Sequence, residues 1–383
     1  MSEQLQTIHR VTCAIRRERN HGAMEQLGNI GLRSVFVESG RCVRRRRRGR
    51  PFGLPGFSER LEDSPIDVIH FSVPPELSEP VVQRLASALQ INQPGHGTIF
   101  TQECRSFFQN PLTAAAPIVD QDDYPPGLLR DLALITCITS ISGTGEELAR
   151  VALELGTGVP VVTLGAGTGL RDRLGLLRIT VPAEKEVIRL LVPAWDAEGL
   201  MRMLIEKGRL NRPGRGFIYC SPVAAGILDT SLLVGPQQHA ATIEQVVAAI
   251  DRLEKSTAWR RRFPVLDPDS GFSLQSRSEK ITLICQEEFA GKYADVAIAA
   301  GAGAATSARL QQISLGDAPG GACERCTFVV RSAQSKDILN ALTTAQDDIG
   351  VTLESLDVEP VDFSFSYRAE ASRFFRRGGA QSS

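Results

Sequence analysis

The sequence lacks a charge imbalance, a long apolar run and a compact set of cysteines. Its 383 residues carry a net charge of -1, which gives no overall attraction to nucleic acid or to an anionic membrane. The longest nearly uncharged apolar run, residues 132–141, is about half the length of a bilayer-spanning helix. The ten N-terminal residues are polar, so no signal peptide is expected. Eight cysteines spread over the whole length indicate reduced thiols in the cytoplasm.

Recognisable catalytic and metal-binding motifs are also missing. The five histidines are scattered, and neither a Gly-x-Ser-x-Gly elbow nor a His-Glu-x-x-His pair is present. Cys323 and Cys326 form a lone Cys-x-x-Cys, whereas a structural zinc site needs four ligands. We therefore expect no catalytic residues, no metal site and no required cofactor.

Alternating and helix-period hydrophobic patterns occur in the same order three times along the chain. In each pass a strand is followed by a helix, two strands, a helix and a last strand. The first pass covers strands 7–15, 34–38, 66–73 and 98–103, with helices 18–27 and 75–89. The second covers strands 134–139, 159–164, 186–192 and 216–221, with helices 145–155 and 196–207. The third pass, over 280–367, is the weakest match, and together the three indicate an internal repeat of about 100 residues.

Two turns of the same design stand between a helix and a strand. The first turn (residues 94–97) reads Pro-Gly-His-Gly, and the second turn (residues 213–216) reads Pro-Gly-Arg-Gly. Glycines let the backbone fold so tightly that consecutive N–H groups point at one anion. Arg215, with Arg209 and Arg212 before it, adds positive charge and several hydrogen-bond donors. No such turn occurs in the third pass.

These residues, above all GTGVPVVTLGAGTG, EVIRLLV and RPGRGFIYCSPV, resemble the nitrogen regulatory P-II family. The resemblance is most specific in the second pass and looser in the others. It implies an α+β fold of three tandem ferredoxin-like (βαββαβ) domains. Because the family assembles such units as trimers, one chain with three copies is expected to be a monomeric intramolecular pseudo-trimer.

The repeat places domain boundaries in the sequence. We expect a first domain over 1–110, a second over 128–226, a helical linker over 227–278, a degenerate third domain over 279–370 and a disordered tail over 371–383.

The resemblance also implies a nucleotide site between domains. The phosphate-holding B-loop maps to Pro213, Gly214, Arg215 and Gly216, and in the first pass to Pro94, Gly95, His96 and Gly97. Arg212 adds charge, and Gly167, Thr168, Gly169 and Arg171 occupy the second-pass T-loop. The effector implied is ATP, ADP, AMP or a related anion. A dinucleotide-binding interpretation of residues 165–169 is disfavoured because the spacing is not Gly-x-Gly-x-x-Gly.

Five arginines from Arg44 to Arg48 occupy the T-loop position of the first pass. They read either as a solvated loop or as a finger that docks a partner protein, such as a membrane transporter.

Three functions remain open from the sequence. The first is a cytoplasmic P-II-like signal-transduction protein that binds a nucleotide and controls a partner. The second is a scaffold subunit that has lost ligand binding and assembles through residues 44–48 and the helix over 242–259. The third is a nucleotide-dependent or redox enzyme.

Overall fold

The computed structural model describes residues 6–49, 57–107, 128–169, 184–234, 243–261, 273–316 and 320–367. Within them, three segments follow one another along the chain. The first segment comprises β1 (Gln6–Arg16), η1 (Arg17–Arg19), α1 (Asn20–Asn29), β2 (Ser34–Gly49), β3 (Phe57–Val73), α2 (Pro75–Ala88) and β4 (Gly97–Ser106). The second comprises β5 (Leu132–Thr139), α3 (Thr144–Leu155), β6 (Val161–Gly169), β7 (Glu184–Pro193), α5 (Ala194–Lys207) and β8 (Gly216–Val223).

A connector separates the second segment from the third. It holds β9 (Ala225–Ile227), β10 (Leu233–Val234), α6 (Ile243–Glu254) and η3 (Ala258–Arg260). The third segment comprises β11 (Ser278–Gln286), α7 (Ala290–Ala299), β12 (Ala304–Ser314), β13 (Gly321–Arg331), α8 (Ser332–Ile349) and β14 (Ser355–Val361), and β15 (Phe363–Ser366) follows it.

The strands of all three segments belong to one 15-stranded sheet, so the expectation of three tandem ferredoxin-like domains forming a pseudo-trimer is wrong. The sheet runs in the order β10-β2-β3-β1-β4-β14-β11-β13-β12-β6-β7-β5-β8-β15, and β9 pairs with β4 off this path. Strand β4 pairs with β14, β12 pairs with β6, and β2 pairs with both β12 and β6. Strand edges that would bound separate domains are therefore hydrogen-bonded to one another, which removes exposed edges.

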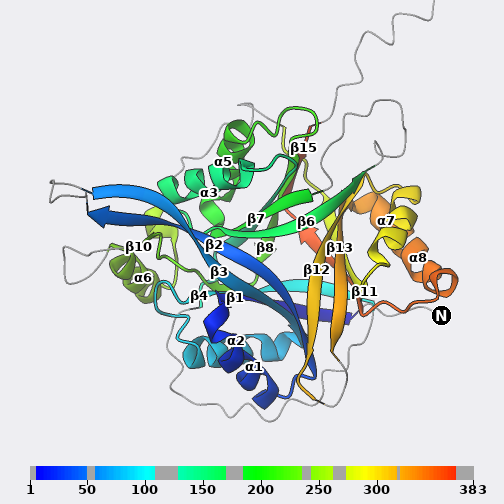
Figure 1. Ribbon diagram of the computed structural model, residues 1–383, viewed down its shortest axis with the longest axis horizontal. Coiled ribbons are helices and arrows are strands. Elements are labelled where there is room, and N and C mark those ends of the chain that lie inside the picture. Colours follow the sequence, from blue (N-terminus) through cyan, green and yellow to red (C-terminus); the bar gives the residue numbers. More distant parts are fainter. Residues whose placement is uncertain are drawn as a thin grey trace, which may run out of the picture.

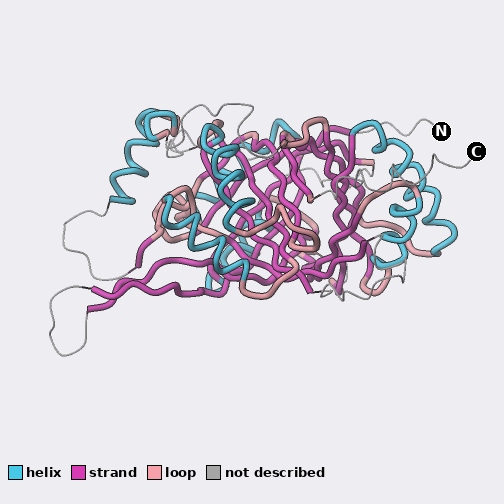
Figure 2. The backbone as a smooth tube through the Cα atoms, turned by 90° about the horizontal axis from the view of Figure 1, so that it is seen from above, coloured by secondary structure: helices cyan, strands magenta, loops and turns pink. Residues whose placement is uncertain are grey.

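Helices cover the outside of the strands in three pairs (Figure 1): α1 with α2, α3 with α5, and α7 with α8. Each pair closes one apolar cluster, and these clusters include Ile69, Ile135 and Leu283. The cluster under α3 and α5 also contains Val43 and Val68 of the first segment. The view from above shows the strands between the helix layers, with the β2–β3 hairpin projecting from the body (Figure 2).

Helix α3 shows how local sequence builds these layers. Its apolar residues Leu148, Ala149, Ala152 and Leu153 recur at helix spacing and are all buried. The helix ends at Gly156, which adopts a left-handed conformation with φ of 69° and so caps it.

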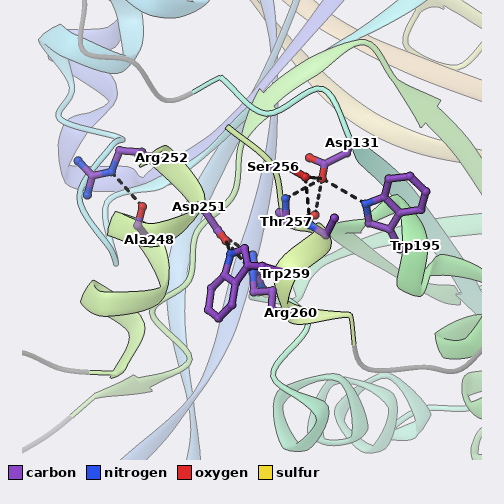
Figure 3. Close-up of polar contacts among 10 residues, drawn as sticks. Asp131, Trp195, Ala248, Asp251, Arg252, Ser256, Thr257, Trp259 and Arg260 are labelled. Carbon is purple, nitrogen blue, oxygen red and sulfur yellow. Dashed lines mark hydrogen bonds and ion pairs between the residues drawn. The ribbon is translucent and has the colours of Figure 1, made fainter. Parts of the chain in front are cut away.

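One aspartate holds the connector to the second segment, and another holds α6 to η3 within the connector (Figure 3). Asp131 accepts hydrogen bonds from the Thr257 N–H (2.7 Å), the Ser256 hydroxyl (2.9 Å) and the Trp195 indole (3.3 Å). Asp251 accepts from the indole of Trp259 and the guanidinium of Arg260. Among the described residues, no helix is long and apolar enough to cross a membrane.

A buried ionic cluster joins the three segments on the face away from the helices. The Oε2 atom of Glu38 in β2 lies 3.2 Å from Arg189 Nη1 in β7 and 2.7 Å from Arg325 Nη2 in β13. Nearby, Arg10 in β1 pairs with Asp357 and Glu359 in β14. Burial alone would raise the pKa of Glu38, but Arg189 and Arg325 outweigh it and hold that pKa well below 4.5.

We expect Glu38→Gln to lower the free energy of unfolding by about 3–5 kcal/mol, because it leaves two buried guanidiniums without their carboxylate. Urea denaturation at neutral pH measures the change. The control is Glu59→Gln, which removes a half-exposed partner of Arg47 and should cost less than about 1 kcal/mol. Equal losses in the two variants would contradict a special role for Glu38.

A second expectation concerns His70, which lies against this cluster. Burial lowers the pKa of His70 from 6.5 to about 3, so the folded chain keeps the ring neutral while the unfolded chain protonates it. Stability from this residue is therefore complete above pH 6.5 and falls as the pH drops. Between pH 7 and 5 the wild type should lose about 2 kcal/mol more than His70→Gln, measured by urea denaturation at both pH values. Parallel losses in the two proteins would show that the ring titrates normally.

Candidate anion-binding turns

The two Pro-Gly-x-Gly turns have the same backbone conformation. Gln90 and Arg209, which precede them at equivalent positions, have φ of 53° and 52°, and Gly95 and Gly214 have φ of 88° and 70°. In the first turn the His96 N–H bonds to the Gln93 carbonyl, and in the second the Arg215 N–H bonds to the Arg212 carbonyl. The chain therefore builds one turn design twice.

The last glycine of each turn is required by a close approach between backbones. A Cβ atom at Gly97 would lie 2.4 Å from the Ala14 carbonyl oxygen, and one at Gly216 would lie 2.3 Å from that of Ile138. No side chain fits at these distances. Each turn is thus pressed against the end of the strand beside it, β1 or β5.

The first turn holds an anion that belongs to the chain itself. Asp229, which follows β9, is 2% exposed, and its Oδ1 accepts the N–H groups of Gly95 and Ser231, both at 2.9 Å. Its Oδ2 lies 2.6 Å from Nη2 of Arg44. Asp229 was not found by sequence reasoning, because it lies beyond the repeat and belongs to no motif.

His96 of the first turn does not supply a positive charge. Burial, followed by the neighbouring Arg19, lowers the pKa of this imidazole below 6.5. At neutral pH the ring is therefore uncharged, and Arg44 provides the cation that faces Asp229.

The second turn lies at the surface with its donors exposed. Arg212 and Gly214 are exposed and Arg215 is partly buried. Within the described part of the chain, the Gly214 N–H has no hydrogen-bond partner, and Arg212 and Arg215 have no ion pair. The position that Asp229 fills at the first turn has no counterpart among the described residues at the second.

The predicted T-loop residues lie apart from the second turn in the sheet. Gly167, Thr168 and Gly169 are in β6 and pair with β12, and strands β7 and β5 separate β6 from β8. Arg171 lies outside the described residues. In the sheet, β6 is therefore not adjacent to β8, the strand into which the second turn leads.

Lys185, a residue that sequence reasoning missed, links these two regions. Its side chain lies against Gly167, and its Nζ donates to the Ser140 hydroxyl at 3.1 Å. The Ser140 N–H in turn donates to the Arg215 carbonyl at 3.1 Å. Only the register of β6 with β7, which pairs Lys185 with Gly165, could have revealed this link.

The arginine run is a paired strand and not an irregular loop. Residues 44–48 lie in β2, opposite residues 58–62 of β3, which include Glu59 and Glu62. Arg46 pairs with Glu62, Arg45 and Arg47 pair with Glu59, and Arg44 pairs with Asp229. Most of the positive charge expected to dock a partner is therefore neutralised within the chain.

Cys323 and Cys326 point to opposite faces of β13. Cys326 packs in the apolar cluster under α7 and α8, whereas Cys323 packs with Phe36 and Leu310. Residues three apart in a strand face opposite ways, so the pair cannot hold one metal ion. Among the described residues, no group of three or more potential metal-ligating side chains is found.

A scan against models of known protein families found no match for the chain, and a search of curated proteins found none either.

We expect Asp229→Ala to destabilise the chain by about 3–5 kcal/mol, because it leaves the buried Arg44 unpaired. Sulfate should restore more stability to this variant than to the wild type, since the Gly95 N–H and Arg44 can bind it in place of the carboxylate. Thermal unfolding in sulfate and in chloride of equal ionic strength measures the difference. Asp63→Ala, which removes a half-exposed partner of Arg41, is the control. An equal sulfate response in all three proteins would contradict the assignment.

Proposed function

We propose that this chain is a P-II-like regulatory protein that binds an adenine nucleotide or a similar phosphate-bearing effector at the second turn and thereby controls a partner protein. One observation carries the proposal. The first turn binds a carboxylate through the Gly95 N–H, and the second turn repeats its conformation with the equivalent Gly214 N–H open to solvent. That the role is regulatory and not catalytic stays a prediction. Turnover of a nucleotide by the chain would contradict it.

Charge favours a phosphate group at this position. Arg215 lies in the turn, and Arg209 and Arg212 precede it and are exposed. Several N–H donors around a phosphate form charge-assisted hydrogen bonds, each contributing about 1.5–3 kcal/mol. Because the turn is exposed, a ligand can bind there from solution and dissociate again.

A route for regulation leads from the second turn to β6. The Arg215 carbonyl, Ser140 and Lys185 form a hydrogen-bonded chain that ends against Gly167. Ligand binding that shifts the turn would shift Lys185 and the end of β6. Such coupling requires that the ligand bind one arrangement of this route more tightly than another.

The first experiment is a calorimetric titration with ATP, ADP and AMP. We expect Arg215→Ala to weaken the affinity about tenfold or more, because it removes a charged donor to the phosphate. His96→Ala is the matched control, since its turn already holds Asp229 and its affinity should be unchanged. Unchanged affinity in Arg215→Ala would sink the assignment.

An assembly subunit without ligand binding is the second candidate, and one observation favours it. Large apolar side chains are exposed on α6 and η3, including Leu253 at 82% and Trp259 at 46%. If no nucleotide raises the melting temperature, and sedimentation shows self-association that Leu253→Ser abolishes, this candidate replaces the first. A nucleotide at 100 times its dissociation constant should instead add about 2.7 kcal/mol of stability.

A further inference from the structure

A basic pocket of about 310 Å³ lies beside the first turn, between β1, β2, β3 and β10. It is separate from the second turn, and it exceeds the volume that a few water molecules need. Its lining includes four arginines and two glutamates: Arg16, Arg17, Arg44, Arg46, Glu18 and Glu62. Asp67 and Asp229 pair with two of these arginines, Arg17 and Arg44.

Arg44 is the residue that defines the pocket. It is only 3% exposed, and two of its three nitrogens have partners, since Nη2 binds Asp229 and Nε donates to the Ser231 carbonyl at 3.0 Å. Its Nη1 atom is buried and has no hydrogen-bond partner among the described residues. A buried guanidinium N–H without an acceptor costs folding free energy, so an anion in the pocket that accepts from Nη1 would be stabilising.

Arg16 supplies a second donor of the same kind. Its Nε atom is also buried without a partner in the described part of the chain, while its Nη1 lies 3.7 Å from Glu18. Arg17 pairs with Asp67 and Arg46 with Glu62, so these two contribute charge but have partners already. The donors without partners therefore come from Arg16 and Arg44.

We propose that this pocket binds the phosphate group of a small phosphorylated metabolite. A phosphate group can accept hydrogen bonds from both of the unpartnered N–H groups, on Arg16 and Arg44. Its oxygens accept from several directions, as donors on two different arginines require. The carboxylates of Glu18 and Glu62 set the limits of the phosphate position, because an anion close to either is repelled. Arg44 then has an anion on each side, Asp229 at the first turn and the ligand in the pocket.

The test uses pyrophosphate and inorganic phosphate as probes in the Arg215→Ala protein, so that the second turn contributes little. Calorimetry should detect binding of pyrophosphate. Adding Arg16→Met, which keeps the aliphatic stem of a partly exposed side chain, should weaken the affinity at least tenfold. The matched control is Arg130→Met, which removes an exposed arginine that pairs with Glu79. Its affinity should be unchanged.

Two results would overturn the proposal. One is that neither probe binds the Arg215→Ala protein, and the other is equal affinity in the Arg16→Met and Arg130→Met variants. Neither bears on the second turn, which is tested by nucleotide binding to the wild type. A further variant, Arg44→Met with Asp229→Asn, removes the buried pair together and so avoids an isolated charge. It should also lose pyrophosphate binding, and retained affinity in that folded protein would count against Arg44 as a donor.

Discussion

The carboxylate of Glu38 lies between two guanidiniums that come from the other two segments of the chain. Glu38 belongs to β2, Arg189 to β7 and Arg325 to β13, so a single buried anion fixes three strands that are far apart in sequence. Such a charge is tolerated inside a protein only while its partners stay in place. The cluster therefore ties the three segments to one position of this carboxylate. Apolar side chains could fill the same space in several registers, but a shared carboxylate accepts only one.

This arrangement explains why two copies of one turn have different surroundings. Where the second segment ends, the chain passes β4, pairs with it as β9, and brings Asp229 into the first turn. It then pairs with β2 as β10, next to the arginine run. Strands β4 and β2 are the two edge strands of the first segment, and β9 and β10 pair with them. The second turn leads into β8. Strand β15 pairs with β8 from Phe217 to Cys220, so this pairing does not extend to the turn.

Local structure could be predicted from the sequence, but the joining of the segments could not. Periodicity located helix α3 and strand β5, and Gly95 and Gly214 revealed the repeated turn because their residue type follows from backbone geometry. Pairing between β4 and β14 leaves no periodic signal, since it depends on edges that are distant in sequence. Asp229 is likewise identified only by its place in space. The hairpin of β2 and β3, in which Glu59 lies opposite Arg47 and Glu62 opposite Arg44, was not predicted, and a loop was expected there.

The carboxylate of Asp229, which belongs to the chain itself, also restricts where an effector can bind. An external anion at the first turn must displace Asp229, which is held by two N–H groups and by Arg44. Because Asp229 is attached to the chain, its effective concentration at the turn is in the millimolar range or above, and a ligand of ordinary affinity competes poorly with it. At the second turn no such competitor is present among the described residues. The same backbone geometry is therefore a structural joint at one place, and at the other it forms the site proposed to bind an exchangeable ligand. In the proposed function a response to ligand would begin at Arg215 and pass through Ser140 and Lys185, which connect this turn with β6.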